Sequence, residues 1–210
     1  PIFTPPVVSN IDGPLGILMA PATGGGTNWP GGSYDPETNI LYVSSNSSVT
    51  GLAVVPPYPG QSDMAYIQGN AATGPRTSGG AGSSVGGGRT EFSPAQRQRP
   101  QSSRGTPPIG IRVQGLPLLK PPYGTISAID LREGTIAWQI PHGQTPDRVA
   151  QHPMLEGTDL PRTGQNASVG TLVTKTLLIA GEGELTVDEN GVRRAMLRAY
   201  HKTTGTEVGA

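Results

Sequence analysis

The chain has 210 residues, of which 34% are hydrophobic and only 5% aromatic, so we expect a thin core for this length. Equal numbers of basic and acidic residues leave no net charge, which argues against nucleic acid as a partner. The lack of cysteine excludes disulfides and thiolate metal sites, and no apolar run approaches the length of a membrane span. Because the chain begins at Pro1 and stops where a strand should run, we interpret it as an internal piece of a longer protein.

The amino-terminal segment predicts short strands separated by turns. Residues 15–19 form an apolar run that is typical of a buried strand, and the turn sequence Asp-Gly-Pro precedes it. A glycine-rich loop, residues 22–32, then surrounds Asn28 and Trp29. Strands are expected next at residues 32–34 and 40–45, the second being rich in β-branched and aromatic side chains.

Residues 70–108 differ in composition from the rest of the chain. They are dominated by Gly, Ser, Pro, Thr, Gln and Arg, so they cannot bury enough apolar surface to offset the entropy of ordering them. We expect a long, disordered surface insertion between two strands of one sheet. A nucleic-acid-binding arginine segment is the alternative, but the scatter of the arginines and the near absence of aromatic residues favour a solvated loop.

The clearest pattern in the chain is a β-hairpin at residues 125–140. Ile126 and Ala128 alternate with polar or opposite-face residues before a charged turn that ends at Gly134. Trp138 lies within the second alternating run. This residue is expected to be an aromatic anchor between neighbouring structural units, because an indole can bury roughly 150–250 Å² there.

A weaker copy of this hairpin occurs downstream, so the chain contains a repeat. The first unit is expected to comprise the strands 32–34, 40–45, 125–131 and 135–140, and the second the strands 170–175, 177–181, 195–201 and 206–209. Gly205 repeats Gly134, whereas Gly209 stands where Trp138 would recur. Repeated four-stranded antiparallel units are typical of a β-propeller. The predicted fold is therefore all-β, with about two blades of a propeller.

The spacing of Ala128, Asp130, Gly134 and Trp138 resembles the tryptophan docking motif of dehydrogenases that use pyrroloquinoline quinone (PQQ), the glucose and alcohol quinoprotein dehydrogenases. The likeness extends over nearly the whole chain except residues 70–108. Further segments that carry it are residues 25–29, 34–38, 41–43, 120–124 and 170–175. The resemblance implies an eight-bladed propeller, of which residues 1–210 would be the carboxyl-terminal blades and the remaining blades a partner.

Function is likewise implied by the resemblance. The family oxidises an alcohol or aldose hydroxyl, such as that of glucose, by hydride transfer to PQQ in the bacterial periplasm, and electrons pass to ubiquinone or a cytochrome. Association with the inner membrane stays open. A calcium ion and an aspartate base assist the reaction, but neither the base nor the calcium ligands have matching positions in this chain. We therefore assign no catalytic and no metal-binding residue here, and expect the fragment alone to be inactive.

Two residues are candidates for binding the cofactor. The resemblance places Asn28 and Trp29 at the central face of the propeller near the quinone, where Asn28 could donate its amide to a quinone oxygen. The alternative is a loop amide satisfied by the backbone, with Trp29 packed as a blade anchor. Asn166 occupies the equivalent place before the first strand of the next blade and could also face the central axis.

Other polar residues receive structural interpretations. His142, His152 and His201 lack the spacing of a zinc site and are expected to be surface or turn histidines. Residues 188–191 are interpreted as a hairpin turn rather than a calcium loop, because the ladder of ligands is incomplete.

A non-catalytic function is the alternative to the enzyme. Scaffold lipoproteins of outer-membrane protein assembly share PQQ-type blade repeats but bind no quinone. The glycine-rich loop around Asn28 and Trp29 argues against that alternative.

Overall fold

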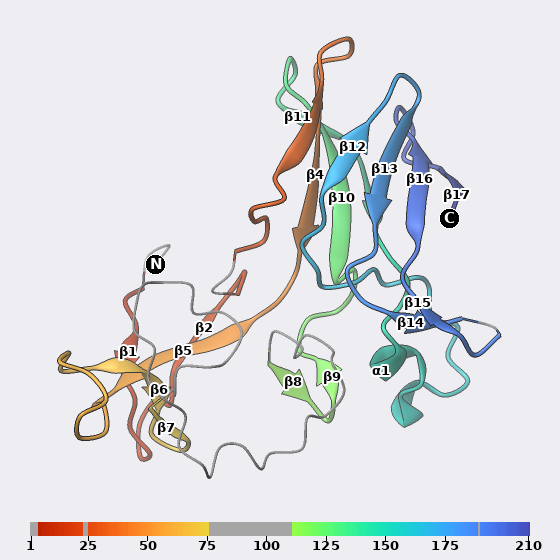
Figure 1. Ribbon diagram of the computed structural model, residues 1–210. Coiled ribbons are helices and arrows are strands. Elements are labelled where there is room, and N and C mark those ends of the chain that lie inside the picture. Colours follow the sequence, from red (N-terminus) through yellow and green to blue (C-terminus); the bar gives the residue numbers. More distant parts are fainter. Residues whose placement is uncertain (1–3, 23–24, 76–110, 189) are drawn as a thin grey trace.

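Residues 4–22, 25–75, 111–188 and 190–210 are described by the computed structural model of the chain (Figure 1). Within these ranges the fold is almost entirely β, with two four-stranded antiparallel blades standing side by side (Figure 1). The predicted fold class is thereby confirmed.

The first blade contains the strands expected from the repeat. Its strands are β3 (Gly32–Asp35), β4 (Ile40–Asn46), β10 (Gly124–Asp130) and β11 (Thr135–Pro141). They lie in the order β11-β10-β4-β3, and Ile126 is paired with both Ser44 and Ile140. Because β4 and β10 are adjacent in the sheet, everything between them is inserted into one blade, as the sequence predicted.

The second blade repeats this arrangement. Its strands are β12 (Thr171–Val173), β13 (Leu177–Gly181), β16 (Leu197–His201) and β17 (Glu207–Gly209), in that order across the sheet. A small hairpin of β14 (Thr186–Val187) and β15 (Arg193–Arg194) extends the loop between β13 and β16. The first strands of the two blades meet where Ser33 Oγ donates to the carbonyl of Thr171.

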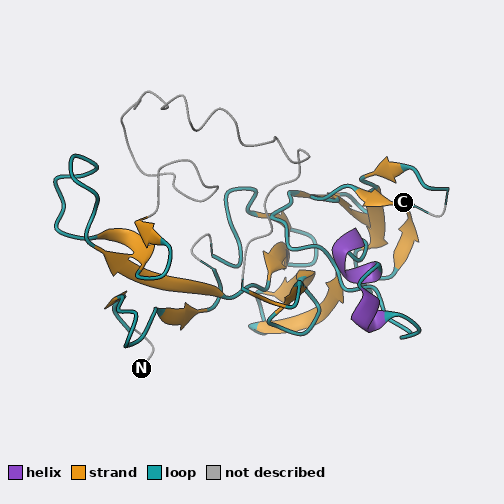
Figure 2. Cartoon of the chain, turned by 90° about the horizontal axis from the view of Figure 1, so that it is seen from below, coloured by secondary structure: helices purple, strands orange, loops and turns teal. Residues whose placement is uncertain are grey.

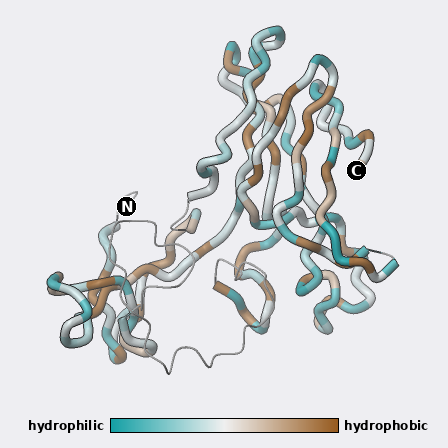
Figure 3. Tube along the Cα trace, in the orientation of Figure 1, coloured by the Kyte–Doolittle hydropathy of each residue, from teal (hydrophilic) through white to brown (hydrophobic). Residues whose placement is uncertain are grey.

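The core lies between the two blades. Its members are buried side chains of the central strands: Tyr42, Ile126, Ala128, Leu178, Ala180 and Tyr200. Brown, hydrophobic stretches run along the strands of both blades in Figure 3. Ile126 and Ala128 are fully buried, as their alternation in the sequence predicted. Each blade thus buries one face against the other.

Trp138 joins the blades, as predicted. Its Nε1 donates to the main-chain carbonyl of Lys202 at 3.0 Å, and its ring lies 5.8 Å from that of Tyr42. Gly205 contacts the indole so closely that a Cβ there would lie 2.8 Å from the Trp138 ring. The buried Lys202 in turn donates to Asp35 of β3 at 2.5 Å, which adds an ion pair to the same junction.

A third sheet lies beside the blades (Figure 2) and was largely missed. It contains β1 (Val7–Val8), β2 (Ile17–Met19), β5 (Thr50–Val55), β6 (Ile67–Asn70) and β7 (Gly74–Pro75). The expectation of a buried strand at residues 15–19 is wrong, since Leu18 in the short strand β2 is 68% exposed. An apolar run therefore did not imply burial here, because Leu15 and Leu18 are exposed whereas Ala53 and Val55 of β5 in the same sheet are buried.

The bounds of the expected insertion also change. Residues 70–75 belong to the β6–β7 hairpin, in which Asn70 pairs with Gly74. After the expected insertion, Arg112–Val113 (β8) pairs with Leu116–Pro117 (β9). The predicted disorder at residues 76–108 lies outside the described residues.

In the described part of the chain, helical structure is confined to two short segments. They are α1 (Asp147–Ala150) and a 3₁₀ turn (Pro153–Leu155), at the end of the blades where β14 and β15 lie (Figures 1 and 2). None of the helices in the described ranges is long and apolar enough to cross a membrane.

Candidate functional site

One end of the two blades gathers the loops that carry polar side chains. β4 ends there at Asn46, β10 begins at Gly124 and β13 ends at Gly181, since neighbouring strands are antiparallel (Figure 1). The loops before β3 and before β12 reach the same end. We call this the loop end.

The Asn28–Trp29 loop is fixed to β4 by one backbone and one side-chain hydrogen bond. The carbonyl of Gly26 accepts from the backbone N–H of Asn46 at 2.7 Å, and Thr27 Oγ1 donates to the carbonyl of Ser44 at 3.1 Å. Trp29 N donates to Asn28 Oδ1 at 2.8 Å, which closes a local turn. A fixed backbone therefore presents two side chains that are both exposed.

Exposure of Trp29 distinguishes it from Trp138. The Trp29 side chain is 95% exposed, so it is not packed as a blade anchor within the described residues. Its indole and the Asn28 carboxamide fit the requirements of a planar quinone, which needs an aromatic platform and a polar group at its edge. Their role as cofactor ligands stays a prediction.

The loop before β12 meets the first loop at Asn46. Asn46 Nδ2 donates to Ser168 Oγ at 3.4 Å, so one side chain connects the approaches to both blades. Asn166 is half-buried two residues earlier and lines a small cavity beside the end of β4. The structure thus brings Asn166 and the Asn28 loop to the same end of the fold, as expected for equivalent positions in adjacent blades.

The small cavity is lined by basic and hydroxyl side chains. We call it the arginine cavity after Arg112 and Arg148, which line it together with Ser48 and Tyr123. Arg148 is held by Glu184 at 2.8 Å, whereas Arg112 Nη1 donates to the carbonyl of Gly115 at 3.1 Å. Burial lowers the pKa of the Arg112 guanidinium, and the positive charge of Arg148 lowers it further.

This cavity was not predicted from the sequence. Arg112 comes from the insertion and Arg148 from a loop that the sequence describes only as long and polar. The signal that could have located them is topological, because loops that follow β4 and β11 must emerge at the same end of an antiparallel blade.

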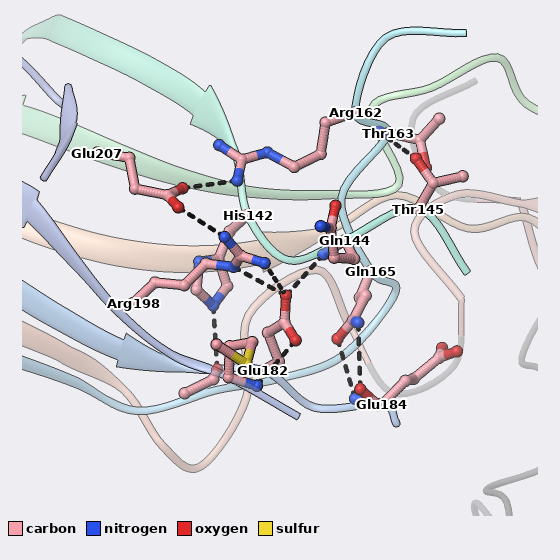
Figure 4. Close-up of polar contacts among 12 residues, drawn as sticks. His142, Gln144, Thr145, Arg162, Thr163, Gln165, Glu182, Glu184, Arg198 and Glu207 are labelled. Carbon is pink, nitrogen blue, oxygen red and sulfur yellow. Dashed lines mark hydrogen bonds and ion pairs between the residues drawn. The ribbon is translucent and has the colours of Figure 1, made fainter. Parts of the chain in front are cut away.

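A network of charged residues lies beside the cavity, between β11 and the second blade (Figure 4). Arg198 of β16 is 4% exposed and bridges Glu182 at 2.7 Å and Glu207 at 2.6 Å. Glu207 also accepts from Arg162 of the loop before β12 at 2.6 Å. The charges of these side chains are paired with one another. We therefore interpret the network as a structural contact within and beside the second blade rather than as a reaction centre.

His142 belongs to this network and corrects the prediction of a surface histidine. It is 4% exposed, its Nδ1 lies 2.8 Å from Tyr200 Oη and its Nε2 lies 3.0 Å from the carbonyl of Gly181. Because a carbonyl can only accept, Nε2 carries the proton and Nδ1 accepts from Tyr200. The correction has a simple cause: His142 follows β11 directly, and the second blade covers it. His201 is exposed, as predicted.

No cluster of three or more His, Asp or Glu side chains suited to a metal ion occurs in the part of the chain that the structure describes. Calcium ligands elsewhere in the protein stay an expectation.

Comparison with known proteins now identifies the family. Residues 1–210 match the family described as the PQQ-type glucose/ethanol/alcohol dehydrogenase, beta-propeller domain. The chain belongs to this family. It is also similar to a protein named "probable quinate dehydrogenase (quinone)" from Xanthomonas campestris pv. juglandis, with 28% identity over 203 residues. That match covers 91% of this chain and 21% of the relative, so the chain spans about a fifth of that relative's length.

Membership of the family gives the two blades their context. They belong to the beta-propeller domain that this family model describes, and Trp138 joins them through its hydrogen bond to the carbonyl of Lys202.

Proposed function

We propose that the full-length protein carrying this chain is a PQQ-dependent oxidoreductase that oxidises the CH–OH group of an alcohol, an aldose or a cyclic hydroxy acid such as quinate. The match of the propeller family to all 210 residues carries the proposal. The name of the relative from Xanthomonas adds the hydroxy acid to the substrates that the sequence suggested. Bound PQQ would accept the hydride, and a ubiquinone or a cytochrome would take the electrons from the protein, which we place in the periplasm.

Two residues of this chain would bind the cofactor. Asn28 would donate its carboxamide N–H to an oxygen of the quinone, and the exposed indole of Trp29 would lie against the flat ring. The hydrogen bonds of the Gly26 carbonyl and the Thr27 hydroxyl to β4 support this role, because they hold the loop beside the end of that strand. Calcium ligands and the catalytic base would come from other parts of the protein.

The test is performed on the full-length protein. PQQ and Ca²⁺ are added to the purified apoprotein, PQQ retention is measured after gel filtration, and dye reduction is followed with ethanol, glucose and quinate. We expect stoichiometric PQQ and dye reduction with at least one of these substrates. A protein that retains no PQQ would instead be the non-catalytic scaffold type, and one that retains PQQ but reduces no dye would contradict the proposed oxidation of these substrates.

A further inference from the structure

The arginine cavity has a composition that the family assignment does not explain. Arg112 reaches it from β8, Arg148 from α1, and Ser48 from the residues that follow β4. Three segments far apart in the sequence therefore converge on one small space. Its volume is about 20 Å³, enough for one or two water-sized groups and too small for a ring.

The polar atoms around this space need an acceptor. Among the described residues, Ser48 Oγ, Arg112 Nε and Arg148 Nε are buried without a hydrogen-bond partner, and Ser48 is only 5% exposed. A buried donor without a partner is costly, because it has lost its bonds to water. These three atoms are all able to donate, so together they favour an acceptor.

The net charge of the side chains around the cavity also favours an anionic ligand. Glu184 pairs with Arg148, while Arg112 forms no ion pair with any described residue. The cavity therefore keeps an excess positive charge in a partly desolvated place. A carboxylate suits it best, since its two oxygens match the planar array of guanidinium N–H groups and its size matches the space.

The cavity lies at the same end of β4 as the proposed cofactor loop, where one end of a substrate would bind. Ser48 lies two residues after Asn46, whose backbone N–H donates to the carbonyl of Gly26 in the Asn28–Trp29 loop. The cavity and that loop therefore flank the same end of β4. A small molecule whose carboxylate entered the cavity would thus be held at the end of β4 that also carries the proposed cofactor loop.

We propose that the arginine cavity binds the carboxylate of a hydroxy-acid substrate, with Arg112 as the residue that selects the acid over neutral alcohols. This inference rests on the proposed dehydrogenase function and adds the substrate class to it. A carboxylate of PQQ itself shares the same chemistry, so the experiment must separate the two sources.

The experiment uses the full-length protein loaded with PQQ. The cyclic hydroxy acid of the substrate panel and its neutral methyl ester are titrated by isothermal calorimetry at pH 7. We expect the acid to bind at least tenfold more tightly than the ester. Arg112→Gln should raise the Kd of the acid about tenfold and leave that of the ester unchanged, because only the charge interaction is removed.

Two further variants make the result specific. Arg112→Lys keeps the charge but loses the planar fork, so it should restore part of the preference for the acid. Arg132→Gln is the matched control, because Arg132 is an exposed arginine in the turn at the opposite end of the first blade and should change neither Kd.

Each other result has a definite meaning. Equal binding of acid and ester by the unmodified protein, or an Arg112→Gln variant that keeps the preference, would overturn the assignment. If Arg112→Gln loses PQQ retention but keeps the preference for the acid, the cavity binds a carboxylate of PQQ. That result would also overturn the assignment of the cavity to the substrate. These failures differ from failure of the proposed function, in which the unmodified protein retains no PQQ or reduces no dye with any substrate.

Discussion

Asn28 is the residue on which the cofactor prediction depends most directly. It is exposed on a loop that Gly26 and Thr27 hydrogen-bond to β4, so its substitution should leave the blades folded and remove only the local turn that Asn28 Oδ1 closes with the Trp29 N–H. In the full-length protein, Asn28→Ala should weaken PQQ binding about tenfold, the value of one hydrogen bond of about 1.4 kcal/mol. Equilibrium titration of the apoprotein with PQQ measures this change.

Asn190→Ala is the control for that prediction, because Asn190 is an exposed asparagine in the turn between β14 and β15. It should leave PQQ binding unchanged. Equal PQQ affinity in the Asn28→Ala variant and the unmodified protein would remove Asn28 from the site.

His142 makes stability depend on pH. Burial lowers the pKa of its imidazole, although the carbonyl of Gly181 partly opposes the effect. Above the unfolded pKa of about 6.5 the ring is neutral in both states and has no pH-dependent effect. As the pH falls below that value, the unfolded chain takes up the proton first, so the free energy of unfolding decreases until the folded pKa is passed.

His142→Gln tests this account by urea unfolding at pH 7.5 and pH 5. At pH 7.5 the variant should lose about 1–3 kcal/mol, because buried hydrogen-bonding groups of Tyr200 and Gly181 lose their partner. Its further loss on going to pH 5 should be smaller than that of the unmodified protein. His201→Gln, at an exposed position, should change stability by less than about 0.5 kcal/mol. An unchanged pH dependence in the His142 variant would show that other groups cause it.

The packing of the two blades against each other depends on residues in the turns at the ends of their strands. Gly134 and Gly205 occupy equivalent turns with φ of 66° and 72°, so both need glycine for the same backbone reason. They differ in surroundings, because an added Cβ at position 134 meets nothing within 4 Å, whereas one at position 205 meets the Trp138 ring at 2.8 Å. The two glycines therefore have different roles although they repeat in the sequence: Gly134 only permits the turn, whereas Gly205 also makes room for the Trp138 ring.

This difference predicts unequal effects of the same substitution. Gly134→Ala should cost about 1 kcal/mol through backbone strain alone. Gly205→Ala should cost about 2–4 kcal/mol, since overpacking against Trp138 adds to the strain. Thermal unfolding of the two variants in the full-length protein provides the comparison, and equal losses would show that the indole contact contributes nothing measurable.

Considered as a whole, the molecule leaves apolar surface uncovered. Large hydrophobic side chains on strands of the three larger sheets are exposed in the described structure: Leu18, Ile136, Leu172, Leu197 and Val208. Propeller blades bury such faces against their neighbours, and this family match describes a propeller domain. The two blades cover only the faces that they turn to each other.

We therefore expect the 210-residue polypeptide alone to expose this surface in solution. It should bind the dye ANS several-fold more strongly per mole than the full-length protein, and it should retain no PQQ. Fluorescence titration of both proteins at equal molar concentration measures the difference. Similar ANS binding by the two would mean that these faces are not covered by further blades.

Much of the fold followed from local patterns. The individual strands of both blades and the turn at Gly134 depend on alternation and turn chemistry, which act between residues close in sequence. The pairing of β4 with β10 across the insertion and the anchoring role of Trp138 were predicted from the repeat. The sheet formed by β5, β6 and β7 was missed because its strands lie among Pro, Gly and Ser residues and pair through contacts that no local pattern shows. Burial of His142 was missed for a related reason, since the covering residues come from the next blade.

The amino-acid sequence by itself determined the all-β class, the two four-stranded repeats, the family and the loop that holds Asn28 and Trp29, because each depends on the order and spacing of residues along the chain. Only the tertiary structure decided that Arg112, Arg148 and Ser48 share one cavity, that Trp29 is exposed while Trp138 is packed, and that His142 is buried. The physical reason is that burial and charge pairing depend on which segments meet in space, and here those segments come from different blades and from an insertion between β4 and β10.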